Sequence, residues 1–138
     1  MKVFFDTNVY VAEALLGETA QQLVEATLAA RWRIYTTPEV LHEIERVLPD
    51  RLGSSRRFAV LTRKRVQRRA TLVVARPGRH RVPDDPADRA VLLGALACGA
   101  DYLVTNDDHL LSLHPYESLR IVSMSDFREL LENRGLWP

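Results

Sequence analysis

The sequence contains a single cysteine, Cys98, among its 138 residues. One thiol cannot form an internal disulfide, and it excludes zinc or iron–sulfur centres built from cysteine. Long apolar runs are also missing, because the longest uncharged stretch, residues 90–100, is far below the roughly 20 residues that cross a bilayer. Asp6 interrupts the apolar start where a signal peptide would need to continue. We therefore expect a cytoplasmic protein with no contact to a membrane.

The chain also lacks internal repeats, low-complexity tracts and linkers rich in glycine or serine. Hydrophobic residues make up 46% of the sequence and charged residues 27%, which is typical of a globular protein rather than a disordered one. The length suits one domain, since domains usually have about 100–150 residues. We therefore expect residues 1–138 to form a single domain.

Acidic residues are absent from residues 51–83, which contain eleven basic residues. The rest of the chain therefore contains eight of the 19 basic residues and all 18 acidic residues. The net charge of +1 is therefore the sum of a basic segment and an acidic remainder. A polyanionic partner suits the first, and a cation site suits the second.

Short apolar runs alternate with helical patterns along the chain. The runs predict strands at residues 3–5, 33–36, 71–75, 102–105 and 119–122. Apolar spacing predicts helices over residues 9–30, from 38 onward, over 56–69, from 86 to about 99, and from about 126 to near 135. We expect Thr37, Ser54 or Ser55, Asp85 and Ser125 to cap the last four of these helices. Prolines at 77, 83 and 86 predict a loop before the helix at 86. This alternation predicts an α/β fold with a mostly parallel sheet.

Two acids follow predicted strands directly. Asp6 comes after the first strand, and Asp107 follows the strand at 102–105 after one intervening residue. Parallel strands end at one edge of the sheet, where α/β proteins bind their ligands. Each acid could instead cap the next helix, but two acids at matching junctions favour a functional site.

Asp88 stands near the start of a helix whose apolar stripe includes Val91, Leu92 and Ala95. At 100° per residue, its side chain falls in the middle of that stripe. Attraction to the helix dipole could explain an acid in the first turn, but it works equally well on the solvent side. A carboxylate that points toward the core needs a partner, which favours a functional role for Asp88.

The helix that begins at Pro38 offers three glutamates. Glu43 and Glu45 flank its apolar stripe on opposite sides, whereas Glu39 lies further away. Most glutamates on surface helices are merely solvated, and periodicity does not choose between Glu43 and Glu45. Several carboxylates at one edge, with no histidine pair at ligand spacing, describe an oxygen-lined site for Mg²⁺ or Mn²⁺. Two such ions can drive hydrolysis of a phosphodiester bond.

Four segments together resemble the successive motifs of the PIN-domain nucleases. They are FDTNV at 5–9, PEVLHEI at 38–44, Asp88 at the start of an alanine-rich helix, and ADYLVTND at 100–107. The resemblance is strongest to VapC-type toxin components of prokaryotic toxin–antitoxin systems. It implies a three-layer α/β/α sandwich around a sheet of about five strands. It also implies an endoribonuclease that depends on Mg²⁺ or Mn²⁺, a cognate antitoxin and a homodimer.

The resemblance assigns metal-ligand and catalytic roles to Asp6, Glu43, Asp88 and Asp107, and so prefers Glu43 over Glu45 by analogy alone. Asn8 and Thr105 match polar positions that support the site. The sequence departs from the pattern at His109, where many relatives have another acid. That departure weakens the case for a second metal ion, although Asp84 and Asp85 lie nearby.

The basic segment completes the functional hypothesis. We expect RNA to contact it, with Arg56, Arg57, Arg63, Arg65 and Arg68 as the candidate residues. Alternatively, the segment is only a solvated helix, or it is a surface that binds the acidic tail of an antitoxin.

Two other functions compete with the nuclease: a catalytically weak PIN-fold module that binds RNA or protein, and a phosphotransfer enzyme with Asp6 as nucleophile. Asn8 argues against the latter, because that class generally has a second aspartate at this position.

Overall fold

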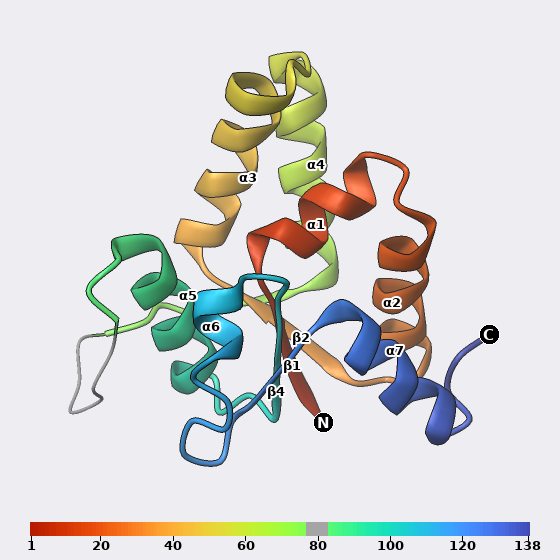
Figure 1. The fold of residues 1–138 in the computed structure, drawn as a ribbon. Helices are drawn as coiled ribbons and strands as arrows, with labels where there is room; N and C mark the ends of the chain where they lie inside the picture. Colours follow the sequence, from red (N-terminus) through yellow and green to blue (C-terminus); the bar gives the residue numbers. More distant parts are fainter. Residues whose placement is uncertain (77–82) are drawn as a thin grey trace.

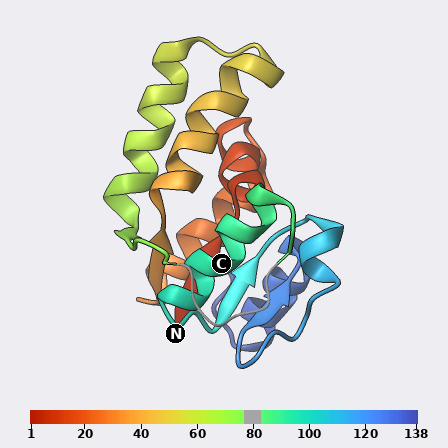
Figure 2. The same cartoon turned by 90° about the vertical axis from the view of Figure 1, so that its left-hand side faces the viewer.

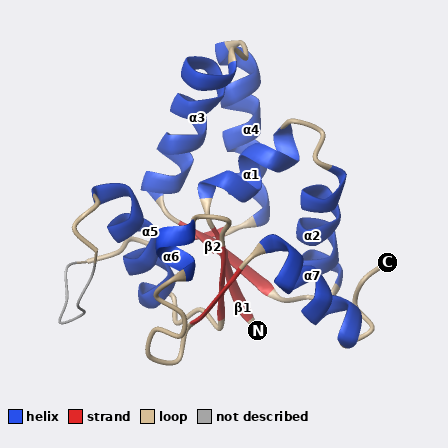
Figure 3. Ribbon diagram, in the orientation of Figure 1, coloured by secondary structure: helices blue, strands red, loops and turns tan. Residues whose placement is uncertain are grey.

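The computed structural model describes residues 1–76 and 83–138. Its sheet contains five strands: β1 (Lys2–Phe5), β2 (Arg33–Thr36), β3 (Thr71–Leu72), β4 (Tyr102–Val104) and β5 (Arg120–Val122). Their order is β3-β2-β1-β4-β5, and every neighbouring pair is parallel. The predicted mostly parallel sheet of about five strands is therefore confirmed. Strand β1 lies at its centre (Figures 1 and 3).

Seven helices occur in the described part of the chain: α1 (Thr7–Ala14), α2 (Glu18–Ala29), α3 (Pro38–Leu52), α4 (Arg56–Arg69), α5 (Pro86–Ala97), α6 (Asp108–Leu111) and α7 (Met124–Asn133). Helices α2 and α7 cover one face of the sheet, and α5 and α6 cover the other, as the predicted α/β/α sandwich requires (Figure 1). Helices α3 and α4 pack side by side and project beyond the carboxyl ends of the strands (Figures 1 and 2). None of the helices in the described ranges has the length and hydropathy needed to cross a membrane.

The core is built on both faces of β1, because successive side chains of a strand point in opposite directions. The ring of Phe5 lies edge-on to Tyr10 of α1 and Phe127 of α7, with centroids 5.9 Å away in both cases. Phe4 faces Gly94 of α5, where a Cβ atom would lie 2.9 Å from its Cζ. The missing side chain therefore lets α5 approach the sheet closely and places its first turn beside the end of β1.

The single helix predicted over residues 9–30 is wrong, because the structure has two helices with a break before Gly17. Leu16 adopts a left-handed φ of 65° and is 84% exposed, and Leu15 is also exposed, so neither belongs to a buried face. The amide of Gly17 donates to the carbonyl of Ala12, and a Cβ at position 17 would lie 2.5 Å from that oxygen. The sequence predicted one continuous helix because Leu15 and Leu16 continue the apolar pattern through this turn.

Two other boundaries differ from prediction. The strand predicted at 71–75 is limited to Thr71–Leu72, an edge strand whose two residues are exposed. It pairs only with β2, which ends at Thr36. The amide of Val73 still donates to the carbonyl of Thr36 at 2.8 Å, but Val74 and Ala75 lie beyond the end of β2. The final helix is capped by Ser123 rather than Ser125, since the Ser123 hydroxyl accepts from the amide of Asp126 at 3.1 Å. The caps Thr37, Ser55 and Asp85 are confirmed.

Candidate functional site

Asp6 occupies the carboxyl end of the central strand and caps α1. Its Oδ1 accepts from the amide of Thr7 at 2.6 Å, and its Oδ2 accepts from the Thr105 hydroxyl at 2.7 Å. The Asn8 amide also approaches Oδ2, at 3.4 Å. Burial raises the pKa of Asp6 above its usual value, and the negative charges of Asp107 and Glu43 add to that effect against the two short hydrogen bonds. The site thus holds a buried carboxylate that forms no ion pair with any residue of 1–76 or 83–138.

Thr105 joins the two acids that follow strands. Its hydroxyl donates to Asp6 and accepts from the backbone amide of Asp107 at 3.0 Å. Asp107 also caps α6, because its Oδ1 accepts from the amides of His109 at 2.8 Å and Leu110 at 3.4 Å. The capping role and the place at the site therefore coexist in one residue.

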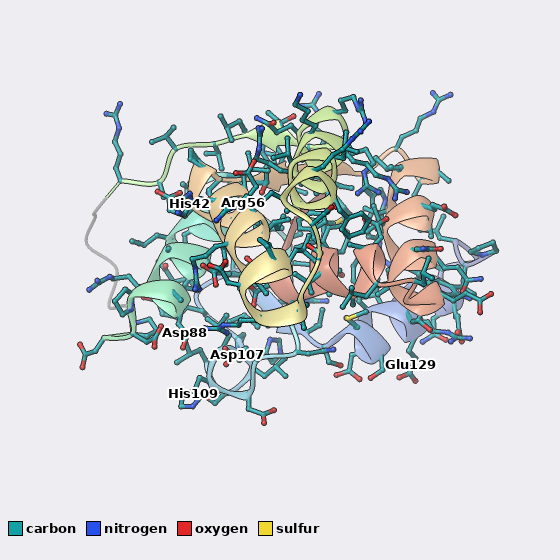
Figure 4. The ribbon with its side chains drawn as sticks, turned by 90° about the horizontal axis from the view of Figure 1, so that it is seen from above. His42, Arg56, Asp88, Asp107, His109 and Glu129 are labelled. Atoms are coloured by element: carbon teal, nitrogen blue, oxygen red, sulfur yellow. The ribbon has the colours of Figure 1, made fainter. Side chains whose placement is uncertain are left out.

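Asp88 lies in the first turn of α5 and faces Asp107 (Figure 4). Burial and the negative charge of Asp107 raise the pKa of Asp88 from 3.8 to about 6. Two carboxyl groups that share a site repel each other once both are ionised. The local sequence positions Asp88, since Asp85 caps α5 and Pro86 begins it, which places Asp88 in the first turn.

Replacing Asp88 with asparagine should stabilise the metal-free protein above pH 6. The pKa of Asp88 is higher in the folded chain, so its ionisation destabilises the fold as pH rises from about 4 to about 6. Allowing for solvent screening, we expect a gain on the order of 1 kcal/mol, or a few degrees in Tm, at pH 8 and none at pH 4. Thermal melts with chelator test this, and Glu129→Gln on α7 is the control (Figure 4). Equal melting temperatures for Asp88→Asn and wild type at pH 8 would contradict it.

The structure separates the two glutamates that periodicity left equivalent. Glu43 lines the same groove as Asp6, Asp88 and Asp107. Glu45 instead points to α4, where it forms an ion pair with Arg63. The position of Glu43 agrees with the family resemblance, whereas Glu45 ties α3 to α4.

The groove has a volume of about 1080 Å³ and lies between α1, α3 and α5. All four candidate acids line it, together with Asn8. Much of the remaining wall is apolar, formed by Val11, Ala12, Leu15, Val40, Val47, Leu52, Ala87, Ala90 and Val91. Arg46 and Arg51 of α3 also line it. Sequence reasoning missed Arg46, whereas Arg51 is the first residue of the predicted basic segment. A signal existed for Arg46, because it follows Glu43 by three residues, a spacing that places two side chains together on a helix.

The donor set fits a hard cation in its chemistry. Four carboxylates meet the groove, and Asn8 adds a buried Oδ1 that has no hydrogen-bond partner in the described part of the chain. An unpaired buried carbonyl oxygen is costly and suits an oxygen-binding ion such as Mg²⁺. As they stand, however, no three His, Cys, Asp or Glu side chains of residues 1–76 and 83–138 are arranged to hold an ion. Glu43 is instead bound to Arg46, with Nη2 to Oε1 at 2.7 Å and Nε to Oε2 at 3.3 Å.

His109, the departure from the family pattern, is exposed on α6. It lines a second cavity of about 490 Å³ with Asp84, Asp85 and Asp88. Asp85 uses Oδ1 to cap α5, accepting from the amides of Ala87 at 2.9 Å and Asp88 at 3.1 Å. Asp84 is exposed and precedes the Asp85 cap of α5.

The predicted RNA-contact residues divide into two groups. Arg56, Arg57 and Arg68 are exposed on α4 (Figure 4 labels Arg56). Arg63 binds Glu45 and Gln67, and Arg65 lies 3.8 Å from Glu13. Residues 77–82 of the basic segment, with Arg79 and Arg81, lie outside the described residues.

This protein is therefore an α/β protein with a group of four acids in a groove at the carboxyl edge of its five-stranded parallel sheet. Residues 2–109, which include all four acids, match the PIN domain family. The chain therefore belongs to the PIN domain family, as its motifs predicted.

A solved structure has a similar fold. A chain in the crystal structure of VapBC2 from Rickettsia felis bound to a DNA fragment from their promoter superposes with a TM-score of 0.64. The match covers 89% of this chain and 98% of that chain at 16% sequence identity. No curated protein matches the sequence significantly.

Proposed function

We propose that this protein is a divalent-metal-dependent endoribonuclease and the toxin of a toxin–antitoxin pair. The observation that carries the proposal is the convergence of Asp6, Glu43, Asp88 and Asp107 on one groove. These acids come from the end of β1, from α3, from α5 and from the start of α6. A structural role for each would not require them to face the same space.

We assign ion binding to these four carboxylates and a supporting role to Asn8 and Thr105. Mg²⁺ or Mn²⁺, when bound, would lower the pKa of a water molecule and neutralise the leaving oxygen of a phosphodiester. Thr105 fixes the orientation of Asp6 through its hydroxyl, and Asn8 approaches the same oxygen. The groove wall keeps Asp6 only 7% exposed, which strengthens its interaction with a cation.

The proposed macromolecular partners are RNA, an antitoxin and a second copy of the chain. The exposed Arg56, Arg57 and Arg68 supply positive charge for a phosphate backbone. Fold similarity to a chain of a VapBC2 structure supports the antitoxin. Leu15 and Leu52, which line the groove and are 50% and 46% exposed, offer apolar surface for such a protein. We also assign residues 1–138 to one domain.

A cleavage assay tests the proposal. Single-stranded and hairpin RNAs are incubated with the purified protein and Mn²⁺, Mg²⁺ or excess EDTA. We expect cleavage with at least one metal, none with EDTA, and recovery when Mn²⁺ is restored. Cleavage that persists in EDTA, or that is equal in the wild type and Asp6→Asn, would contradict the proposal, because the activity would then come from another source.

A binding module without turnover is the second candidate function. It is favoured by the pairing of Glu43 with Arg46, which leaves the acids without a ready ligand cluster in the described residues. Calorimetry distinguishes the two functions. The nuclease should bind Mn²⁺ in the absence of RNA, whereas the binding module should bind RNA but no Mn²⁺.

A further inference from the structure

Arg46 follows the candidate metal ligand Glu43 by three residues, one turn along α3. Its guanidinium binds both oxygens of Glu43, in a two-point contact within one turn of α3. The side chain of Arg46 is 41% exposed and that of Glu43 is 32% exposed, so neither is locked by packing. An exposed ion pair of this kind is weak and breaks readily.

We propose that Arg46 alternates between Glu43 and a phosphate of the nucleic-acid substrate, and so couples substrate binding to completion of the metal site. This inference rests on the proposed nuclease function. With no substrate, Arg46 occupies the oxygens that Glu43 would offer to an ion. With a strand in the groove, the guanidinium turns to a phosphate and leaves Glu43 to the metal.

The position of Arg46 on the groove wall would let its guanidinium reach a phosphate of a strand bound in the groove. Arg46 and Arg51 lie on the wall formed by α3, whereas none of the five arginines of α4 predicted to contact RNA lines this groove. On a helix with a rise of about 1.5 Å per residue, Arg46 stands about 4.5 Å along the axis from Glu43, and Arg51 about 12 Å. A strand whose scissile phosphate meets the acids therefore passes Arg46 first and Arg51 next. Guanidinium groups bind phosphates by the same two-point geometry that Arg46 now uses on a carboxylate.

Two other ion pairs show what distinguishes this one. Glu45 pairs with Arg63 across two helices, outside the groove, and serves to join α3 to α4. Arg128 and Glu132 form an exposed pair within α7, at 2.6 Å, and neither residue lines the groove. Only the pair of Arg46 and Glu43 among the described ion pairs has both members on the groove wall. Arg128→Gln is therefore a matched control for Arg46→Gln.

The experiment measures two affinities of each purified variant. Calorimetry gives Mn²⁺ affinity without RNA, and fluorescence anisotropy gives affinity for a short labelled single-stranded RNA at several salt concentrations. The RNA titration uses Ca²⁺ in place of Mn²⁺, with integrity of the RNA checked on a gel. Arg46→Lys is the conservative variant, because it keeps the charge and loses the two-point geometry.

The two affinities of Arg46→Gln should change in opposite directions. Mn²⁺ binding should tighten about two- to fivefold, because a competitor for Glu43 is gone. RNA binding should weaken about three- to tenfold, and the slope of its logarithmic salt dependence should fall by about 0.7, the value for one phosphate of a single strand. Arg46→Lys should recover part of the RNA affinity, and Arg128→Gln should change neither.

Three results separate the hypotheses. If Arg46→Gln matches Arg128→Gln in both affinities, the pair only stabilises α3 and the inference is wrong. If Mn²⁺ and RNA affinities fall together, Arg46 supports Glu43 rather than competing for it, and the inference is again wrong. If the wild type binds no Mn²⁺ and cleaves no RNA, the proposed function itself fails, a result distinct from a functional wild type with a silent Arg46.

Discussion

Purified Asp6→Asn protein should cleave RNA at least about a hundredfold more slowly than the wild type. Loss of groups that merely support a metal ligand typically costs about 10- to 100-fold, so loss of a ligand should cost at least the upper value. Asparagine has the shape of aspartate but carries no charge, and one of its two oxygens becomes a donor. It can therefore still accept from the amide of Thr7, while the attraction for a cation is lost.

The fold should survive this substitution. Burial raises the pKa of Asp6, so its negative charge is a cost to the metal-free protein at neutral pH. We expect the Tm of Asp6→Asn to equal or exceed that of the wild type in the presence of chelator. Circular dichroism melts and the rate of RNA cleavage, measured on the same preparation, check the two expectations together.

Asp101→Asn is the matched control. Asp101 precedes β4 at the opposite end of the sheet, where its Oδ2 accepts from the amide of Lys2 at 2.8 Å. Its removal should leave RNA cleavage unchanged. Full activity in Asp6→Asn would show that Asp6 is not needed for cleavage. Equal losses of activity in both variants would show that any change of charge disturbs the protein.

The largest loss of stability should follow from Arg69→Met. Arg69 binds both oxygens of Glu13, at 2.6 and 2.7 Å, and so joins α4 to α1. Glu13 is only 3% exposed, so the substitution leaves a buried carboxylate without its main partner. Breaking such a pair from one side costs about 3 kcal/mol, which corresponds to a fall in Tm of roughly 10 °C.

The cost should come from the unpaired charge rather than from the loss of an attractive contact. A double variant, Glu13→Gln with Arg69→Met, should therefore recover much of the stability lost by Arg69→Met. Arg68→Met changes the neighbouring, exposed arginine and should leave the Tm within about 1 °C of the wild type. Equal Tm values for Arg69→Met and Arg68→Met would show that the pair contributes nothing to stability.

The sequence predicted the parts of the site that follow from chain topology. Asp6 and Asp107 could be placed at one edge because both follow strands of a parallel sheet, and the helical position of Asp88 indicated that it would not face solvent alone. The choice of Glu43 over Glu45 depends on where α4 lies, because Arg63 of that helix takes Glu45. That packing is a long-range property, which periodicity along α3 does not contain.

Other features were missed for local reasons. The turn at Leu16 and Gly17 carries an apolar pattern that a continuous helix would also show, so the break between α1 and α2 went undetected. Arg46 stands at an ordinary spacing from Glu43, and such pairs are common on solvated helices. Only the shared groove, which needs three helices in place, distinguishes this pair from a surface ion pair.

The Thr105 hydroxyl determines how much ordering remains for ion binding. It donates to Asp6 and accepts from the amide of Asp107, so one side chain holds both residues in fixed relation. Because the amides of His109 and Leu110 in turn hold the Asp107 carboxylate, the conformational entropy of these two acids is lost when the chain folds. A cation bound at the proposed site would then have only Glu43 and Asp88 left to immobilise, which lowers the entropic cost of binding.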